Sequence, residues 1–216
     1  MDSYKMLGND SEINKIIDTI NEINKDTFTA CHGKYHTLFV ILMTEHILKS
    51  LLYDARTIEL GKIAALLHDI GNIAGRRSHA HKGAALASVF LDDLGCFMPE
   101  EKSMIVHAIK DHSNGEDITS AIGAALLIAD KVDISKRRIF SVKNIDAWHK
   151  NLLEIENVDL HISDKSIIID YITTEAFSKD LLISGYAKGF NLPTKAAEYL
   201  GCSCYFHFNG KNENIV

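Results

Sequence analysis

The amino-acid sequence predicts a mainly α fold, a helical bundle with a small α+β extension at its C-terminus. Apolar residues recur at helical spacing up to about residue 145, and only 2 of the 216 residues are proline. Scarce proline favours long, uninterrupted helices. After that point the pattern changes to short runs rich in β-branched residues. We therefore expect a helical domain over 1–145 and a small α+β extension over 146–216 that packs on it.

The helical part divides into successive segments that each repeat apolar residues every three or four positions. These segments are 11–25, 35–53, 57–69, 79–94, 99–112 and 118–134. Ser11 and Ser78 stand where an N-cap is expected. Gly71 and Gly95 stand where a helix often ends in a left-handed residue.

The extension begins with two β-prone runs, 158–162 and 166–172, joined by a short polar turn. A helix is expected over 174–189, and a final strand in the sequence CSCYFHF, residues 202–208. The two cysteines and the histidine of this last run resemble a zinc motif only weakly. Their alternation with phenylalanine favours a half-buried strand over a metal site.

Composition restricts the class of protein. Hydrophobic residues make up 46% and charged residues 24% of the chain, which is typical of a globular protein. The net charge of −6 argues against broad binding to nucleic acid or to an anionic membrane. No stretch approaches the roughly 18 apolar residues that span a bilayer, and the first residues lack the core of a signal peptide. The four cysteines form no CxxC pair, so we expect reduced thiols and a cytoplasmic protein.

The histidines are distributed unevenly, since 8 of the 11 lie between His32 and His112. Successive helix residues are rotated by about 100°, so each histidine can be assigned to a helix face. His36 shares its face with Val40 and Ile47, and the polar residues of that helix lie opposite. His36 is therefore expected on the core side.

Two other helices carry candidate ligands. In the 99–112 helix, His112 falls within about 20° of the apolar Ile105, whereas His107 points about 200° away. His112 is therefore expected to face the core and His107 the solvent. Asp130 ends the apolar run AIGAALLIA, so its carboxylate is expected to be buried. A buried carboxylate needs a cation, a metal ion or a proton.

Side chains of the metal-ligand types thus converge from several helices of the predicted bundle. They are His36, His68, Asp69, His79, His112 and Asp130. Helical bundles build metal sites in this way, from side chains on facing helices. A shared metal would satisfy these buried groups together. The alternative is a set of separate core histidines with a surface aspartate.

This pattern resembles the HD-domain metal-dependent phosphohydrolases, from about Tyr35 to Arg138. Five segments carry the resemblance. They are YHTLFV (His36), LLHDIGN (His68, Asp69), SHAHKGA (His79), AIKDHS (His112) and LLIADKVDISKRR (Asp130). The resemblance implies an HD-domain helical bundle for this part of the chain.

The resemblance also implies two divalent transition metal ions. The core ligands would be His36, His68, Asp69 and Asp130. His79 and His112 match the extra histidines of members that hold a second ion, with Asp69 bridging the two. Histidine and carboxylate ligands without thiolates suit Fe or Mn, with Ni, Co or Zn as alternatives. Two such ions can hold a bridging hydroxide and stabilise both the attacking and the leaving oxygen of a phosphoester.

Cationic side chains near these ligands are candidates for contacts with a phosphate. Arg76 and Arg77 lie in the loop before His79, and a guanidinium suits phosphate geometry. Both could also form a solvated turn. Lys131 follows Asp130 and would contact phosphate or offset the Asp130 charge. Arg138 and its neighbour Arg137 are expected to be surface charges.

The expected function is a metal-dependent phosphoric ester hydrolase that acts on a small phosphate ester or nucleotide through a metal-bridging hydroxide. SNGED follows His112 in place of the signature of the cyclic-di-GMP branch. His79 separates the chain from the one-metal nucleotidases. Two alternatives stay open: a mixed-valent di-iron oxygenase on the same fold, and a non-catalytic regulatory module. The expected partner is a small phosphorylated substrate, with no nucleic acid and no membrane.

Overall fold

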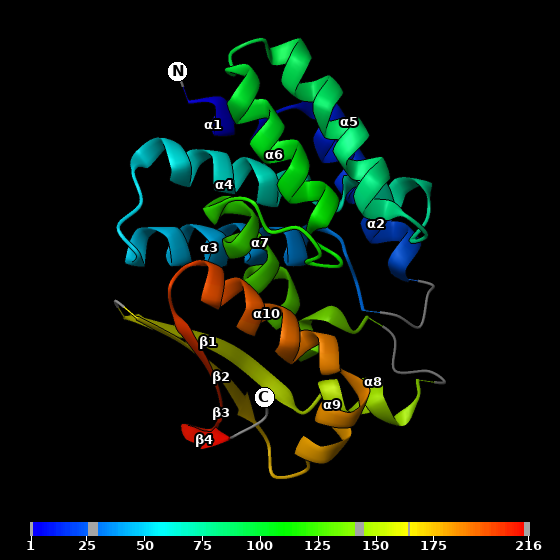
Figure 1. Cartoon of the computed structure of the whole chain (residues 1–216). Helices are drawn as coiled ribbons and strands as arrows, with labels where there is room; N and C mark the ends of the chain where they lie inside the picture. The colour runs from blue at the N-terminus through cyan, green and yellow to red at the C-terminus, as the bar shows by residue number, and fades with distance from the viewer. Residues whose placement is uncertain (1, 26–29, 141–144, 164, 214–216) are drawn as a thin grey trace.

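A small sheet lies at one end of a bundle of helices (Figure 1). The computed structural model describes residues 2–25, 30–140, 145–163 and 165–213. The helices before the extension are α1 (Ser3–Gly8), α2 (Ser11–Lys25), α3 (Lys34–Ser50), α4 (Ala55–Leu67), α5 (His79–Leu94), α6 (Pro99–Asp111) and α7 (Ala121–Val132). Two short 3-10 helices, η1 (Ile70–Ala74) and η2 (Lys136–Arg138), follow α4 and α7. The mainly α fold predicted from the sequence is confirmed.

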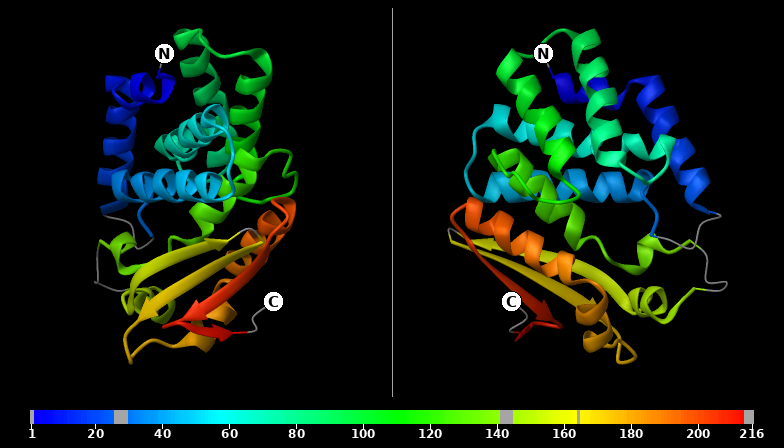
Figure 2. Two further views of the ribbon diagram at one scale, coloured as in Figure 1. Left: turned by 90° about the vertical axis from the view of Figure 1, so that its left-hand side faces the viewer. Right: turned by 45° about the vertical axis from the view of Figure 1, so that its right-hand side comes forward.

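The extension contains the helices α8 (Ala147–Leu152), α9 (Lys179–Gly185) and α10 (Ala187–Tyr199). Its strands are β1 (Ile155–Ser163), β2 (Ser166–Thr173), β3 (Ser203–Phe208) and β4 (Lys211–Glu213), in the spatial order β1-β2-β3-β4. β1 and β2 pair in antiparallel fashion, as do β3 and β4, while β2 and β3 are parallel. Figure 2 shows from two sides that this sheet lies at the end of the helical body away from the N-terminus.

Helix α10 connects the two parts, because it packs against α7 on one side and against β3 on the other. The buried apolar residues of the body and the extension form one continuous core. Polar contacts add to this packing: Tyr186 Oη donates to the Lys131 carbonyl at 3.2 Å, and His46 Nε2 to the Leu160 carbonyl at 3.2 Å. The extension is therefore held directly against the helix that carries Asp130.

The predicted helix over 174–189 is wrong. The chain forms α9 and then α10, which continues through Pro193 to Tyr199. Proline lacks the N–H that would bond to the residue four positions earlier, so its cost inside a helix is limited to one lost bond and local crowding. Phe190, Pro193 and Ala197 are buried on one face of α10, and this apolar face outweighs the local preference against proline.

Two predicted helix signals also differ. Asp10 Oδ1, and not Ser11, accepts the first backbone N–H groups of α2, from Glu12 and Ile13. Gly71 lies inside η1 without a positive φ. A Cβ on Gly71 would lie 2.1 Å from the His79 carbonyl oxygen and 2.4 Å from the nitrogen of Gly83. Gly71 therefore permits a close approach of η1 to α5.

Ser78 also departs from its prediction. It precedes α5 with φ of 57°, and its side chain forms no capping hydrogen bond. Gly95, by contrast, ends α5 in the left-handed conformation with φ of 61°, as predicted. Within the described residues, no helix is long and apolar enough to cross a membrane.

Candidate metal centre

The C-terminal ends of three helices and the first turns of two others bring the candidate ligands together in the core of the body. His36 lies in the first turn of α3 and Asp130 in the last turn of α7. His68 and Asp69 follow α4, and His112 follows α6. His79 opens α5. The close approach at Gly71 places His79 beside Asp69, since η1 begins directly after Asp69.

One group of ligand atoms surrounds Oδ2 of Asp69. His68 Nε2 lies 3.3 Å and His36 Nε2 3.6 Å from this oxygen. Asp130 Oδ1 lies 3.2 Å from His36 Nε2 and 3.9 Å from His68 Nε2. His36, His68 and Asp130 are all buried. We refer to Asp69, His36, His68 and Asp130 as group 1.

A second group lies at the other oxygen of the same carboxylate. His79 Nε2 is 3.4 Å and His112 Nε2 is 3.6 Å from Asp69 Oδ1. The two Nε2 atoms are 3.2 Å apart. We refer to Asp69, His79 and His112 as group 2. Asp69 thus faces one group with each of its oxygens.

All four histidines are oriented by hydrogen bonds on the ring nitrogen remote from Asp69. His36 Nδ1 pairs with Asp133 Oδ2 at 2.7 Å. The Nδ1 atoms of His68, His79 and His112 pair with the carbonyls of Ala65, Arg76 and Ile109 at 2.8, 3.0 and 2.6 Å. A carbonyl or an ionised carboxylate oxygen accepts a hydrogen bond, so in the neutral imidazole the proton lies on Nδ1 and the lone pair on Nε2. In their neutral forms the four histidines therefore point four lone pairs into the centre.

These lone pairs make a metal ion the natural occupant. The Nε2 atoms of His36 and His68 lie 3.2 Å apart, the same separation as those of His79 and His112. Two nitrogens that both lack a proton cannot hydrogen-bond to each other. A cation between them and the carboxylates would satisfy every one of these groups, and the donor set of imidazole and carboxylate suits a divalent transition metal. The residues present therefore fit the metal that the sequence pattern implies.

Electrostatics hold the carboxylates in the ionised form that a metal requires. Burial alone would raise the pKa of Asp69, but His68 and His32 outweigh burial and hold this pKa well below its usual range. Burial also opposes ionisation of Asp130, yet Lys131, at 2.6 Å, and His36 keep the pKa of Asp130 well below its usual value. Burial lowers the pKa of His79, which favours its neutral, ligating form.

His32 is a member of the site that sequence reasoning missed. Its Nδ1 lies 2.7 Å from Asp69 Oδ2. Burial, with the nearby Arg138 cation, lowers the pKa of His32 to about 3, although Asp69 acts in the opposite direction. His32 precedes α3, so no helical periodicity indicated which way its side chain points. The clustering of histidines was the available signal.

Arg138 corrects another expectation, since it is buried and not a surface charge. Its Nε donates to the Cys31 carbonyl and its Nη1 to the Asp133 carbonyl, both at 2.9 Å. Its Nη2 lies 3.1 and 3.3 Å from the two ring nitrogens of His32. A guanidinium has five donors, so the Arg138 side chain can join the adjacent residues Cys31 and His32 to Asp133, about 100 positions later in the chain. Arg137 is exposed, as expected, and lies over the ring of Phe39.

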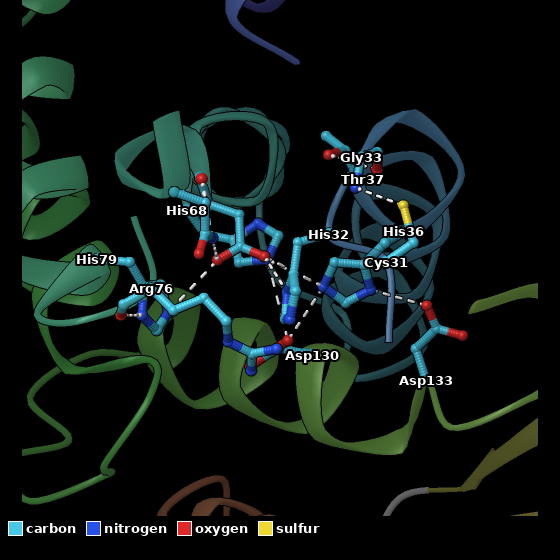
Figure 3. Close-up of polar contacts among 12 residues, drawn as sticks. Cys31, His32, Gly33, His36, Thr37, His68, Arg76, His79, Asp130 and Asp133 are labelled. Atoms are coloured by element: carbon cyan, nitrogen blue, oxygen red, sulfur yellow. Dashed lines mark hydrogen bonds and ion pairs between the residues drawn. The ribbon is translucent and has the colours of Figure 1, made fainter. Parts of the chain in front are cut away.

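Asp69, Asp130, His79 and His112 lie in the wall of a cavity of about 470 Å³. Arg76 and Lys131 line this cavity, and Figure 3 shows Arg76 extending from its loop toward the histidine cluster. Arg77 is exposed and is not part of the lining. His107 lies away from the centre, with Nε2 bonded to the Asp117 carbonyl at 2.8 Å. The structure thus assembles the six candidate ligands with Arg76 and Lys131, and leaves Arg77 outside.

Fold and site together define a helical metal-binding domain with histidine and aspartate ligands. The family model of the HD domain matches residues 33–166, which contain all six candidate ligands. The chain therefore belongs to the HD-domain family, a superfamily of metal-dependent hydrolases. No curated protein matches the chain.

Among solved structures, the chain is similar to a predicted HD superfamily hydrolase from an uncultured Thermotogales bacterium. The two are 29% identical, with a TM-score of 0.47. The match covers 57% of this chain and 67% of that one.

Proposed function

We propose that this protein is a metal-dependent phosphohydrolase that cleaves a small phosphate ester or nucleotide with two divalent metal ions. One observation carries the proposal: each oxygen of Asp69 faces its own group of lone pairs. A carboxylate between two such groups suits two ions a few Å apart, the arrangement that serves phosphoester hydrolysis.

In this proposal, group 1 holds one ion and group 2 the other. When bound, the ions would activate a water molecule and offset the negative charge of a phosphate. Fe or Mn is the first expectation for their identity.

The chain's own cations would bind the substrate. Arg76 lines the cavity, and among the described residues its side chain forms no ion pair. Its guanidinium is therefore available for a bidentate contact with phosphate. Lys131 is held against Asp130, so its charge is shared between that carboxylate and the cavity. Burial disfavours the charged form of Lys131, but Asp130 outweighs it and raises the Lys131 pKa, which keeps the ammonium charged.

The test is turnover of a panel of phosphate esters and nucleotides by the purified chain, stripped of metal and reloaded with Mn(II) or Fe(II). We expect hydrolysis that depends on the metal and not on oxygen. Asp69→Asn should abolish it, because the amide cannot supply two anionic oxygens. Turnover that requires oxygen would favour the oxygenase, and a fully loaded protein without any turnover would favour the regulatory module.

A further inference from the structure

The cavity beside the metal groups has a wall that belongs to the extension. Trp148, His149 and Leu152 from α8 line it, together with Tyr186 and Lys188 at the start of α10. We refer to these five residues as the extension wall. None of them is one of the candidate metal ligands, and a volume of about 470 Å³ falls in the range of roughly 300–1,000 Å³ that is typical for organic ligands.

Aromatic rings form much of the extension wall. The Trp148 and His149 ring centroids are 5.1 Å apart at 89°, and those of Trp148 and Tyr186 are 5.7 Å apart at 52°. Trp148 is half-buried, so part of its surface is open. A planar ring of a ligand could stack on such a side chain, and this contact tolerates any nucleobase because every base has a π face.

Local contacts fix the position of these rings. A Cβ on Gly185 would lie 2.3 Å from Cδ1 of Trp148, so the indole packs directly on the Gly185 backbone. The Tyr186 hydroxyl donates to the Lys131 carbonyl at 3.2 Å, one residue from Asp130. The extension wall is therefore tied to the helix that carries part of group 1. A stacking surface held in this way is preorganised for a ligand that also reaches the metal groups.

Charge on the extension wall points to an anionic ligand. Lys188 is exposed, and among the described residues neither Lys188 nor Arg76 forms an ion pair. Arg138, by contrast, is committed to the Cys31 and Asp133 carbonyls. Two cations that form no ion pair with the described part of the chain thus line one cavity, one from the body and one from the extension.

We propose that the extension wall is a subsite for the planar ring of a nucleotide, which stacks on Trp148 while its phosphate lies at the metal groups. The proposal rests on the proposed function, since it assigns the organic part of that substrate. It gives the extension a role in selecting nucleotides over phosphate esters that lack a planar ring.

Trp148 provides a direct readout because it is the single tryptophan of the chain. The full chain, loaded with Zn(II), would be titrated with adenosine monophosphate and, as a matched ligand without the base, with ribose 5-phosphate. We expect saturable quenching of Trp148 fluorescence by the nucleotide and little change with the sugar phosphate. Equal responses to both ligands would overturn the proposal.

Variants separate stacking from folding. Trp148→Leu should weaken nucleotide binding about fivefold to 150-fold by calorimetry, the range expected for the loss of base stacking, whereas Trp148→Phe should retain most of the affinity. Gly185→Ala keeps Trp148 but should push its indole ring out of position, so this variant should weaken nucleotide binding as well. Ribose 5-phosphate affinity and metal content should not change in any variant. The matched control is Tyr205→Leu, because Tyr205 is an exposed aromatic residue of β3 that does not line the cavity.

The outcomes distinguish this proposal from the proposed function. If the chain hydrolyses phosphate esters but Trp148→Leu binds the nucleotide as tightly as the unaltered chain, the subsite is wrong and the function stands. If nucleotide binding depends on Trp148 but no phosphate ester is hydrolysed, the subsite stands and the function is wrong.

Discussion

His32 Nδ1 lies 2.7 Å from Oδ2 of Asp69, the carboxylate shared by both groups of ligand atoms. Asn72 Nδ2 donates to the other oxygen, Oδ1, at 2.8 Å. Each oxygen of Asp69 therefore has one donor from the protein in addition to its group of ligands. Such donors fix the rotation of a ligating carboxylate before a metal binds.

His32 should act by positioning Asp69. The His32 ring donates its Nδ1 proton to Asp69 in a hydrogen bond, and its Nε2 accepts a hydrogen bond from Arg138. The ring therefore has no free lone pair for a metal ion. We expect His32→Ala to weaken metal binding about 10- to 100-fold while two ions still bind at saturation. His32→Asn, whose amide can replace the Nδ1 donor, should restore much of the affinity. Calorimetric titration with Mn(II) measures both, and complete loss of one ion would identify His32 as a ligand instead.

His107 lies within α6 and His112 directly follows this helix, but the two histidines should behave differently when replaced. His112→Ala removes a nitrogen from group 2, so bound metal should fall from two ions toward one. His107 is bonded to the Asp117 carbonyl outside the centre, so His107→Ala should keep both ions. Metal analysis of the dialysed proteins makes the comparison, and equal losses from the two variants would contradict the assignment of group 2.

Arg76 and Arg77 are adjacent, yet the structure places only Arg76 in the cavity lining. Loss of one guanidinium–phosphate contact costs about 1.5–3 kcal/mol, so Arg76→Ala should lower kcat/KM about tenfold to 150-fold. Arg77→Ala should have a smaller effect, and metal content should stay constant in both. If the two variants lose activity equally, the loop must rearrange when substrate binds.

Gly71 should tolerate no side chain, because the Cβ of alanine would collide with the backbone of His79 and Gly83. Forcing η1 away from α5 should destabilise Gly71→Ala by about 1–3 kcal/mol and separate Asp69 from His79. The expected result is a lower unfolding midpoint in denaturant together with a weaker second metal site. Gly75→Ala probes the same loop where a Cβ meets no neighbour within 4 Å, although its φ of 87° adds backbone strain. Unlike Gly71→Ala, this variant should leave metal binding intact.

Arg56 joins α4 to α6 by donating to both carboxylate oxygens of Glu101, at 2.7 and 2.8 Å, and to Glu59 at 2.7 Å. Hydrogen bonds from Arg56 hold the pKa of Glu101 below its usual value. A depressed carboxylate pKa stabilises the folded state above the unfolded pKa, and this contribution disappears as the pH falls through the folded pKa.

Arg56→Gln should therefore lower the free energy of unfolding near neutral pH. The cluster is partly exposed, so we expect a loss of about 1 kcal/mol. The difference between the variant and the unaltered chain should begin to shrink below roughly pH 4.3, the ordinary pKa of a glutamate in an unfolded chain, and should be lost as the pH falls through the lower folded pKa of Glu101. Urea unfolding at neutral pH and at a pH well below the ordinary glutamate pKa provides the measurement. A difference that does not depend on pH would show that packing of the Arg56 side chain, and not its charge, stabilises the fold.

The sequence alone determined the helical class of the body and the residue types of the ligand set. Both follow from local information: the 3.6-residue period assigned His36 and His112 to the core and His107 to the outside. The apolar run before Asp130 predicted the burial of its carboxylate. In the extension the three predicted strands coincide with β1, β2 and β3, but the one helix predicted over 174–189 is wrong. There the buried face of α10 outweighed the local signal of Pro193.

Only the tertiary structure decided which loop residues belong to the site. His32, Arg138 and Arg76 lie outside the α-helices, so no period predicts where their side chains point. Their positions depend on contacts between segments far apart in the chain, such as the bond from Arg138 to the Cys31 carbonyl. The same holds for Trp148 and Tyr186, which line the cavity because α10 packs between α7 and the sheet. Helical periodicity is a property of neighbouring residues, whereas a cavity wall is a property of the packing between elements, and the sequence does not state that packing locally.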